Sequence, residues 1–149
     1  MLTAKGKYSL KALTHLATLE PGAMSQAAKI AEANNIPKKF LDAILGELRT
    51  AGMVHSKKGR GGGYVLARPA DAIMVGSIIR SLDGQLAPIG CASRAFFRRC
   101  EDCPLDRPCA VQRIMEEVRD AIAAVLDARS LTQFRQLAEV REEPLLQDS

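Results

Sequence analysis

Four cysteines stand close together in the second half of the chain and are the residues best suited to chemistry. Their spacing is Cys91-x8-Cys100-x2-Cys103-x5-Cys109, so one short segment holds all four thiols. Thiolates are soft ligands that suit iron–sulfur clusters, zinc and copper(I). We therefore expect residues 91–109, called the cysteine loop below, to bind a metal or to respond to oxidation.

Three chemistries fit the cysteine loop, and the residues alone leave them open. An iron–sulfur cluster, either [2Fe–2S] or [4Fe–4S], takes cysteine ligands, and four thiolates complete such a site. Zinc also needs four ligands. The third alternative is a metal-free thiol or disulfide switch, because we expect nearby arginines to lower the pKa of the thiols. Four arginines lie in the loop: Arg94, Arg98, Arg99 and Arg107. They would equally help to hold an anionic cluster.

The segment before this loop has the pattern of a DNA-binding unit. Apolar residues recur at helical spacing over residues 5–19, in a short second segment with Ser25 as the expected N-cap, and from Pro37 through Phe40 to Leu48. Two strands, 53–56 and 63–66, then flank a basic, glycine-rich tip. Three helices followed by such a hairpin predict a winged helix-turn-helix.

The third helix and the hairpin tip carry the side chains that we expect to meet double-stranded DNA. The early turns of such a helix reach base edges in the major groove, and a basic tip suits phosphates or a narrow minor groove. The candidates are Lys38, Lys39, Asp42, Lys57, Lys58 and Arg60. Residues 1–70 hold 11 Lys and Arg against 4 Asp and Glu, whereas residues 71–149 hold 10 against 13. The front of the chain is therefore the expected site for a polyanion.

The remaining segments predict a sensor and dimerisation region at residues 71–140. A helix is expected over residues 75–82, a long helix from about Cys109, and a last helix over 130–140. The long helix has an apolar seam with steps of three and four: Val111, Ile114, Met115, Val118, Ile122, Val125 and Leu126. Residues 141–149 are expected to form a disordered tail. The predicted fold class is mainly α, a winged helix-turn-helix with a small β-hairpin wing and a long C-terminal dimerisation helix.

Several other classes of protein are disfavoured. No apolar run approaches the ~20 residues of a membrane span, and no signal-peptide core precedes Lys5, so we expect a cytoplasmic protein without membrane contact. Only two histidines exist, and neither is near the cysteines in sequence, which argues against an enzyme. Cys100 and Cys103 have the spacing of a redox pair but no βαβ pattern around them.

The chain resembles the IscR, NsrR, RirA and CymR group of bacterial transcription regulators. The resemblance spans Leu2 to about Leu137 and rests on several motifs together. They are Lys5-Gly6-Lys7-Tyr8-Ser9-Leu10, the helix from Ile36 to Leu48, Lys58-Gly59-Arg60-Gly61-Gly62-Gly63-Tyr64, the segment Asp83 to Cys91, and Val118-Arg119-Asp120-Ala121-Ile122 with Val125-Leu126-Asp127. The resemblance implies a homodimer on a partly palindromic operator, with the long helices crossing at the interface.

The resemblance also implies a ligand set. Cys91, Cys103 and Cys109 match the three cysteines that hold the cluster in the iron–sulfur members, while Cys100 is additional. Gln112 stands where IscR supplies a histidine, and glutamine is a poor iron ligand. The fourth ligand would be Cys100 or a first-helix residue of the partner subunit, for which Tyr8 of the partner subunit is a poor donor and His15 of the partner subunit a better one.

The expected function is a DNA-binding transcription regulator, a repressor, whose operator affinity follows an iron–sulfur cluster or the thiol redox state of the cysteine loop. The alternative is a metal-free regulator of sulfur or cysteine metabolism, similar to CymR, that acts through thiol oxidation or a partner enzyme. The stretch Leu86-Ala87-Pro88-Ile89 resembles that branch.

Overall fold

The computed structural model describes residues 2–103 and 109–139. Arg107 and the expected tail at 141–149 lie outside the described residues. The helices are α1 (Ala4–Ala17), α2 (Ala27–Asn34), α3 (Lys38–Thr50), α4 (Val75–Asp83), α5 (Ala110–Asp127) and α6 (Leu131–Leu137). Strands β1 (Val54–Lys57) and β2 (Gly63–Leu66) form the hairpin, and two 3-10 turns cover Ala70–Ala72 and Gly90–Ala92. No helix in this part of the chain is long and apolar enough to cross a membrane.

The expected winged-helix fold is confirmed. The hairpin pairs antiparallel, with Val54 opposite Leu66 and Lys57 opposite Gly63. The helix boundaries follow local chemistry: the Thr3 side chain accepts a hydrogen bond from the Gly6 amide at the start of α1. Asn35 ends α2 in the left-handed conformation, with φ of 52°.

The expected role of Ser25 as a helix cap is wrong. Gln26 occupies the N-cap position of α2, while Ser25 pairs with Tyr64 of β2 through two backbone hydrogen bonds of 3.0 and 2.8 Å. Gly63 makes this pairing possible. Its φ is +133°, and a Cβ there would lie 2.5 Å from the Ser25 carbonyl oxygen. Pairing with the strand therefore determines the position of Ser25 in place of its local preference for capping a helix.

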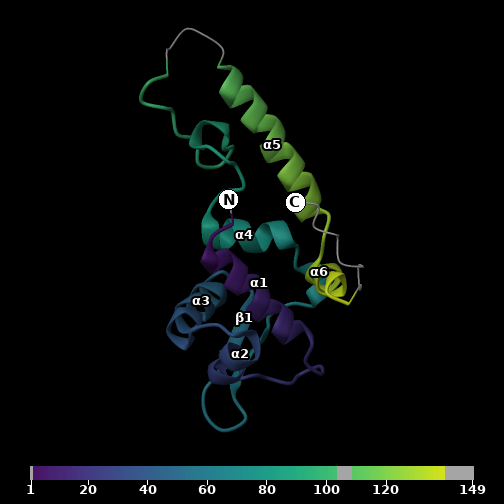
Figure 1. Cartoon of the computed structure of the whole chain (residues 1–149). Coiled ribbons are helices and arrows are strands. Elements are labelled where there is room, and N and C mark those ends of the chain that lie inside the picture. Colours follow the sequence, from purple (N-terminus) through teal and green to yellow (C-terminus); the bar gives the residue numbers. More distant parts are fainter. Residues whose placement is uncertain (1, 104–108, 140–149) are drawn as a thin grey trace, which may run out of the picture.

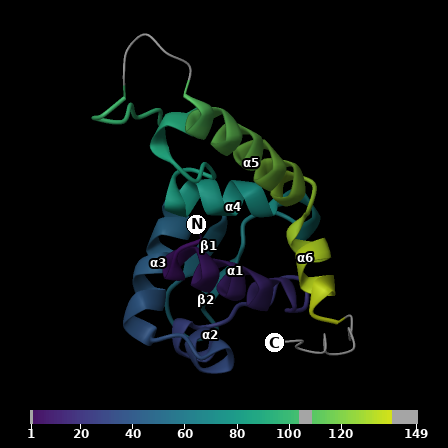
Figure 2. The same cartoon turned by 45° about the horizontal axis from the view of Figure 1, so that its top comes forward.

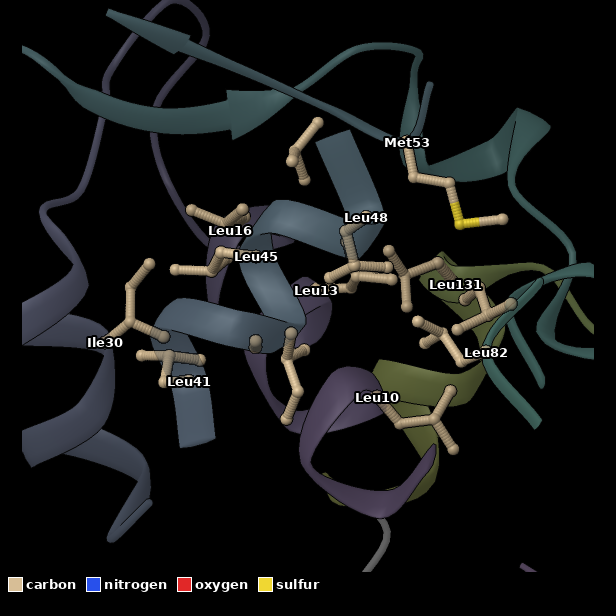
Figure 3. Close-up of a cluster of buried hydrophobic side chains, with 14 of the residues drawn as sticks. Leu10, Leu13, Leu16, Ile30, Leu41, Leu45, Leu48, Met53, Leu82 and Leu131 are labelled. Atoms are coloured by element: carbon tan, nitrogen blue, oxygen red, sulfur yellow. The ribbon is translucent and has the colours of Figure 1, made fainter. Parts of the chain in front are cut away.

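A single hydrophobic core joins the winged-helix unit, residues 2–66, to later parts of the chain (Figure 3). Leu13, Leu41 and Leu48 are fully buried in it. Ile78 of α4 and Leu131 of α6 belong to the same core and are also fully buried. The core therefore continues across the boundary expected at residue 70.

Helix α4 lies between α1 and α5 (Figures 1 and 2). The Arg80 guanidinium on α4 pairs with the Asp127 carboxylate at the end of α5 through contacts of 2.6 and 2.8 Å. The hairpin and α2 lie at one end of the molecule, and the cysteine loop and the start of α5 lie at the opposite end. Helices α4 and α5 therefore lie between the described cysteine residues and the winged-helix unit.

Candidate DNA interface and cysteine loop

The start of α3 presents its polar side chains to solvent. Lys38, Lys39 and Asp42 are all exposed. The Lys38 ammonium lies 3.0 Å from the Asp42 carboxylate, an ion pair one helical turn apart. Lys39 lies beside this pair on the outward face. Within the described residues, the first turn of α3 therefore carries Lys38 in an ion pair and Lys39 without one.

Phe40 does not join the core, although it belongs to the apolar pattern by which the sequence predicts this helix. Its side chain is 63% exposed. The buried side of α3 consists of Leu41, Ile44, Leu45 and Leu48, and successive helical residues are 100° apart. Phe40 therefore falls at the edge of the apolar stripe, where periodicity alone cannot decide its direction.

The hairpin tip carries three further exposed cations, Lys57, Lys58 and Arg60. The turn between them is tight: a Cβ at Gly62 would lie 2.2 Å from the Lys57 carbonyl oxygen, so only glycine fits there. The six candidate residues thus lie on the two elements expected, α3 and the wing.

The cysteine loop brings the Cys100 thiol into contact with Cys91. Cys91 is buried in the turn Gly90–Ala92, and Cys109 is the N-cap residue of α5. The Cys100 thiol is hydrogen-bonded to Cys91, and Cys109 is close enough to act on Cys100 electrostatically. The Cys103 amide donates to the Cys100 carbonyl oxygen at 3.2 Å. None of the four forms a disulfide.

The prediction that arginines lower the thiol pKa is wrong for Cys100. Its pKa is raised, first by the hydrogen bond to Cys91 and then by the negative charges that Cys91, Asp102 and Cys109 would carry. Two of the loop arginines have partners other than the Cys100 thiol: Arg94 pairs with Asp120 at 3.2 Å, and Arg99 donates to the Cys103 carbonyl oxygen at 3.0 Å.

The donor set suits a soft metal centre, but its geometry is not fully assembled. Within residues 2–103 and 109–139, no three His, Cys, Asp or Glu side chains converge as metal ligands. Four cysteine sulfurs in one segment, two of them in contact, remain the chemistry that an iron–sulfur cluster requires. Metal binding often organises a site that is loose without it.

Two residues that sequence reasoning did not assign fasten the loop to α5. The Gln112 side-chain amide donates to the Cys91 carbonyl oxygen at 2.9 Å. Arg119 donates to the Ala92 carbonyl oxygen at 2.5 Å and to the Asp120 carboxylate at 3.0 Å. Gln112 therefore serves as a donor to the loop backbone. Its position, where IscR supplies a histidine, was the one sequence signal that pointed to Gln112.

A family model described as an iron-dependent transcriptional regulator, Rrf2, matches residues 2–136. The chain belongs to the Rrf2 family. It is 37% identical over 134 residues to an Rrf2-like helix-turn-helix regulator of Rhodobacter capsulatus, covering 88% of this chain and 89% of the relative. It is 32% identical over 130 residues to the transcriptional regulator CymR of Bacillus subtilis, covering 87% and 86%.

Solved structures agree with the Rrf2 assignment. The structure of CymR, the global cysteine regulator of B. subtilis, superposes with a TM-score of 0.75 at 31% identity, covering 92% of this chain and 97% of CymR. IscR of T. potens superposes with a TM-score of 0.73 at 27% identity, covering 95% and 93%. This Rrf2 protein is thus a DNA-binding transcriptional regulator and not an enzyme.

Proposed function

We propose that this regulator is a cytoplasmic repressor in which residues 1–70 read DNA and residues 71–140 sense and dimerise. Its operator affinity follows an iron–sulfur cluster, [2Fe–2S] or [4Fe–4S], held by Cys91, Cys103, Cys109 and Cys100. The observation that carries the ligand set is the contact between Cys100 and Cys91, with Cys109 nearby. The additional cysteine lies beside the positions that the family resemblance implies, so four thiolates are available without Gln112.

The chain's own contacts supply a route from this site to the winged-helix unit. A bound cluster would provide a redox-sensitive tie between Cys91 and Cys109 at the start of α5. Gln112 and Arg119 hold the backbone of Cys91 and Ala92 against α5. At its other end, α5 is joined to α4 by Asp127 and Arg80. A change in the loop therefore acts first on the position of α5.

The test is anaerobic purification followed by a visible spectrum and assays of iron, sulfide and zinc. We expect a coloured protein with iron and sulfide near stoichiometric, which Cys100→Ser loses and Gln112→Ala keeps. Gel shifts with holo and apo protein should differ in affinity. Zinc without sulfide, or a colourless protein free of metal, would overturn the cluster proposal and leave DNA binding intact.

A metal-free thiol switch is the second candidate, and the same contact favours it. Oxidation by a two-electron oxidant such as a peroxide would join Cys91 and Cys100 with loss of two thiol hydrogens. An oxidised form of Staphylococcus aureus CymR is among the similar structures, with a TM-score of 0.71 and 32% identity. A mass decrease of about 2 Da in colourless protein, absent in Cys91→Ser, would establish the disulfide.

We also propose that α3 enters the major groove while the wing follows the backbone. Support comes from the exposure of Lys38, Lys39 and Asp42 on one element and of the three tip cations on the other. Removing a wing cation such as Lys58 should weaken binding to all sequences alike and lower the salt dependence by about one counterion. A change in sequence preference instead would reassign Lys58 to base reading.

The exposed stripe on α5 supports a homodimer. The exposed fractions of Val111, Ile114, Val118 and Val125 are 54%, 50%, 37% and 60%. Each of these apolar side chains is seven or fewer residues from the next on one helix, which is an unusual display for a protein surface. Sedimentation at micromolar concentration should show a dimer. Ile114→Glu should shift it to monomer, whereas Glu117→Ala, an exposed neighbour off the stripe, should not.

A further inference from the structure

Phe40 is the large apolar side chain that the first turn of α3 presents to solvent. Phe40 is 63% exposed, like the exposed Lys38 and Lys39 before it and unlike the fully buried Leu41 after it. A phenyl ring exposed to this extent gains little from the fold, because most of its apolar area stays in water. Its position on the element proposed to enter DNA suggests a contact made only in the complex.

Along the line of α3 that continues from Lys39, the next two positions are small. Ala43 is exposed one turn after Lys39, and a Cβ added at Gly46 would meet nothing within 4 Å. Side chains of this size let the helix backbone approach the floor of a groove, but they offer little to distinguish one base from another. Along this line, selective contacts must therefore come mainly from the first turn.

We propose that Phe40 is a specificity-determining residue that packs against the C5 methyl group of thymine in the major groove. The thymine methyl is the apolar group that base pairs expose in the major groove, and aromatic side chains such as phenylalanine contact it. A phenyl ring cannot bind a phosphate, unlike the adjacent lysines, so its contribution must depend on the base. The proposal rests on the placement of α3 in the major groove given above.

The experiment begins by selecting high-affinity duplexes from a randomised library with the full-length protein. Each thymine of a selected duplex is then replaced by deoxyuridine, which removes only the methyl group. Fluorescence anisotropy titrations compare wild type, Phe40→Ala and Lys39→Ala on both duplexes. Phe40 is exposed, so its truncation should leave the fold intact, which thermal denaturation checks.

For wild type we expect one thymine per half-site whose replacement weakens binding roughly fourfold, the value of one buried methyl group. Phe40→Ala should bind the thymine duplex more weakly and should not distinguish it from the uracil duplex. Equal thymine-to-uracil ratios in Phe40→Ala and wild type would overturn the proposal. Lys39→Ala should weaken both duplexes equally. If it weakens neither, α3 does not enter the groove, and the proposed interface fails along with the role of Phe40.

Discussion

The hydrogen bond from Gln112 to the Cys91 carbonyl oxygen is the most direct link between the cysteine loop and α5. Its length is 2.9 Å and it is partly shielded from solvent. Gln112→Ala removes the donor and leaves the carbonyl in place. A neutral hydrogen bond of this kind contributes about 1 kcal/mol net, which corresponds to roughly a fivefold change in the population of loop-open molecules. The rest of the fold should be unaffected, because the bond joins only the loop to α5.

Limited proteolysis measures this opening. Trypsin cleaves after arginine, and Arg94, Arg98 and Arg99 lie exposed in the loop. Where opening is fast compared with cleavage, the cleavage rate follows the open population, so Gln112→Ala should be cut in the loop roughly fivefold faster than wild type. Glu117→Ala, an exposed substitution on the same helix, serves as the control. A Gln112→Ala rate equal to that of the control would refute the clamp.

Three further predictions concern the remainder of the fold. Leu131→Ala should cost about 3 kcal/mol and lower Tm by roughly 10 °C, measured by thermal denaturation, because the side chain is fully buried. Burial and then the charge of Lys29 lower the pKa of His15, so stability should decline as pH falls below about 6.5, and His15→Gln should remove that decline in urea titrations. The hydrogen bond to Arg80 lowers the pKa of Asp127, so the pair stabilises the fold above about pH 4 and is lost in acid. Since both side chains are more than 40% exposed, Asp127→Asn should cost at most about 1 kcal/mol in the same titrations.

The elements that the sequence predicted well are those in which local preference and packing agree. The helix now described as α4 was predicted to within one residue, since apolar spacing and Gly84 mark its face and its end. Ser25 misled because its capping preference is local, whereas its pairing with Tyr64 depends on a strand almost 40 residues later. The pattern left the burial of Phe40 undecided, because this residue falls at the edge of an apolar stripe, where a small rotation separates burial from exposure.

The contacts around the cysteines were beyond reach for a different reason. Gln112 bonds a backbone carbonyl 21 residues away, and any residue offers a carbonyl, so the partner leaves no trace in the sequence. The sequence analysis expected a lowered pKa for Cys100, whereas the pKa is raised. The number of arginines in a segment does not tell where each guanidinium lies in the fold. In the fold Arg94 reaches Asp120 instead, and Cys100 has Cys91 as its neighbour.

The two helices that could relay a signal differ in how firmly they are held. Four side chains of α4, including Val75 and Ile78, are almost completely buried in the shared core, and moving them would cost several kcal/mol. Within the described part of this protomer α5 contains no buried residue. It is held by the half-buried Leu126, which packs against the core, and by three polar contacts, those of Gln112, Arg119 and the exposed pair with Arg80. In the proposed mechanism, we therefore expect a change in the cysteine loop to shift α5 against a rigid block made of α4 and the winged-helix unit. If α5 is the dimer contact, such a shift changes the separation of the two winged-helix units rather than the shape of either one.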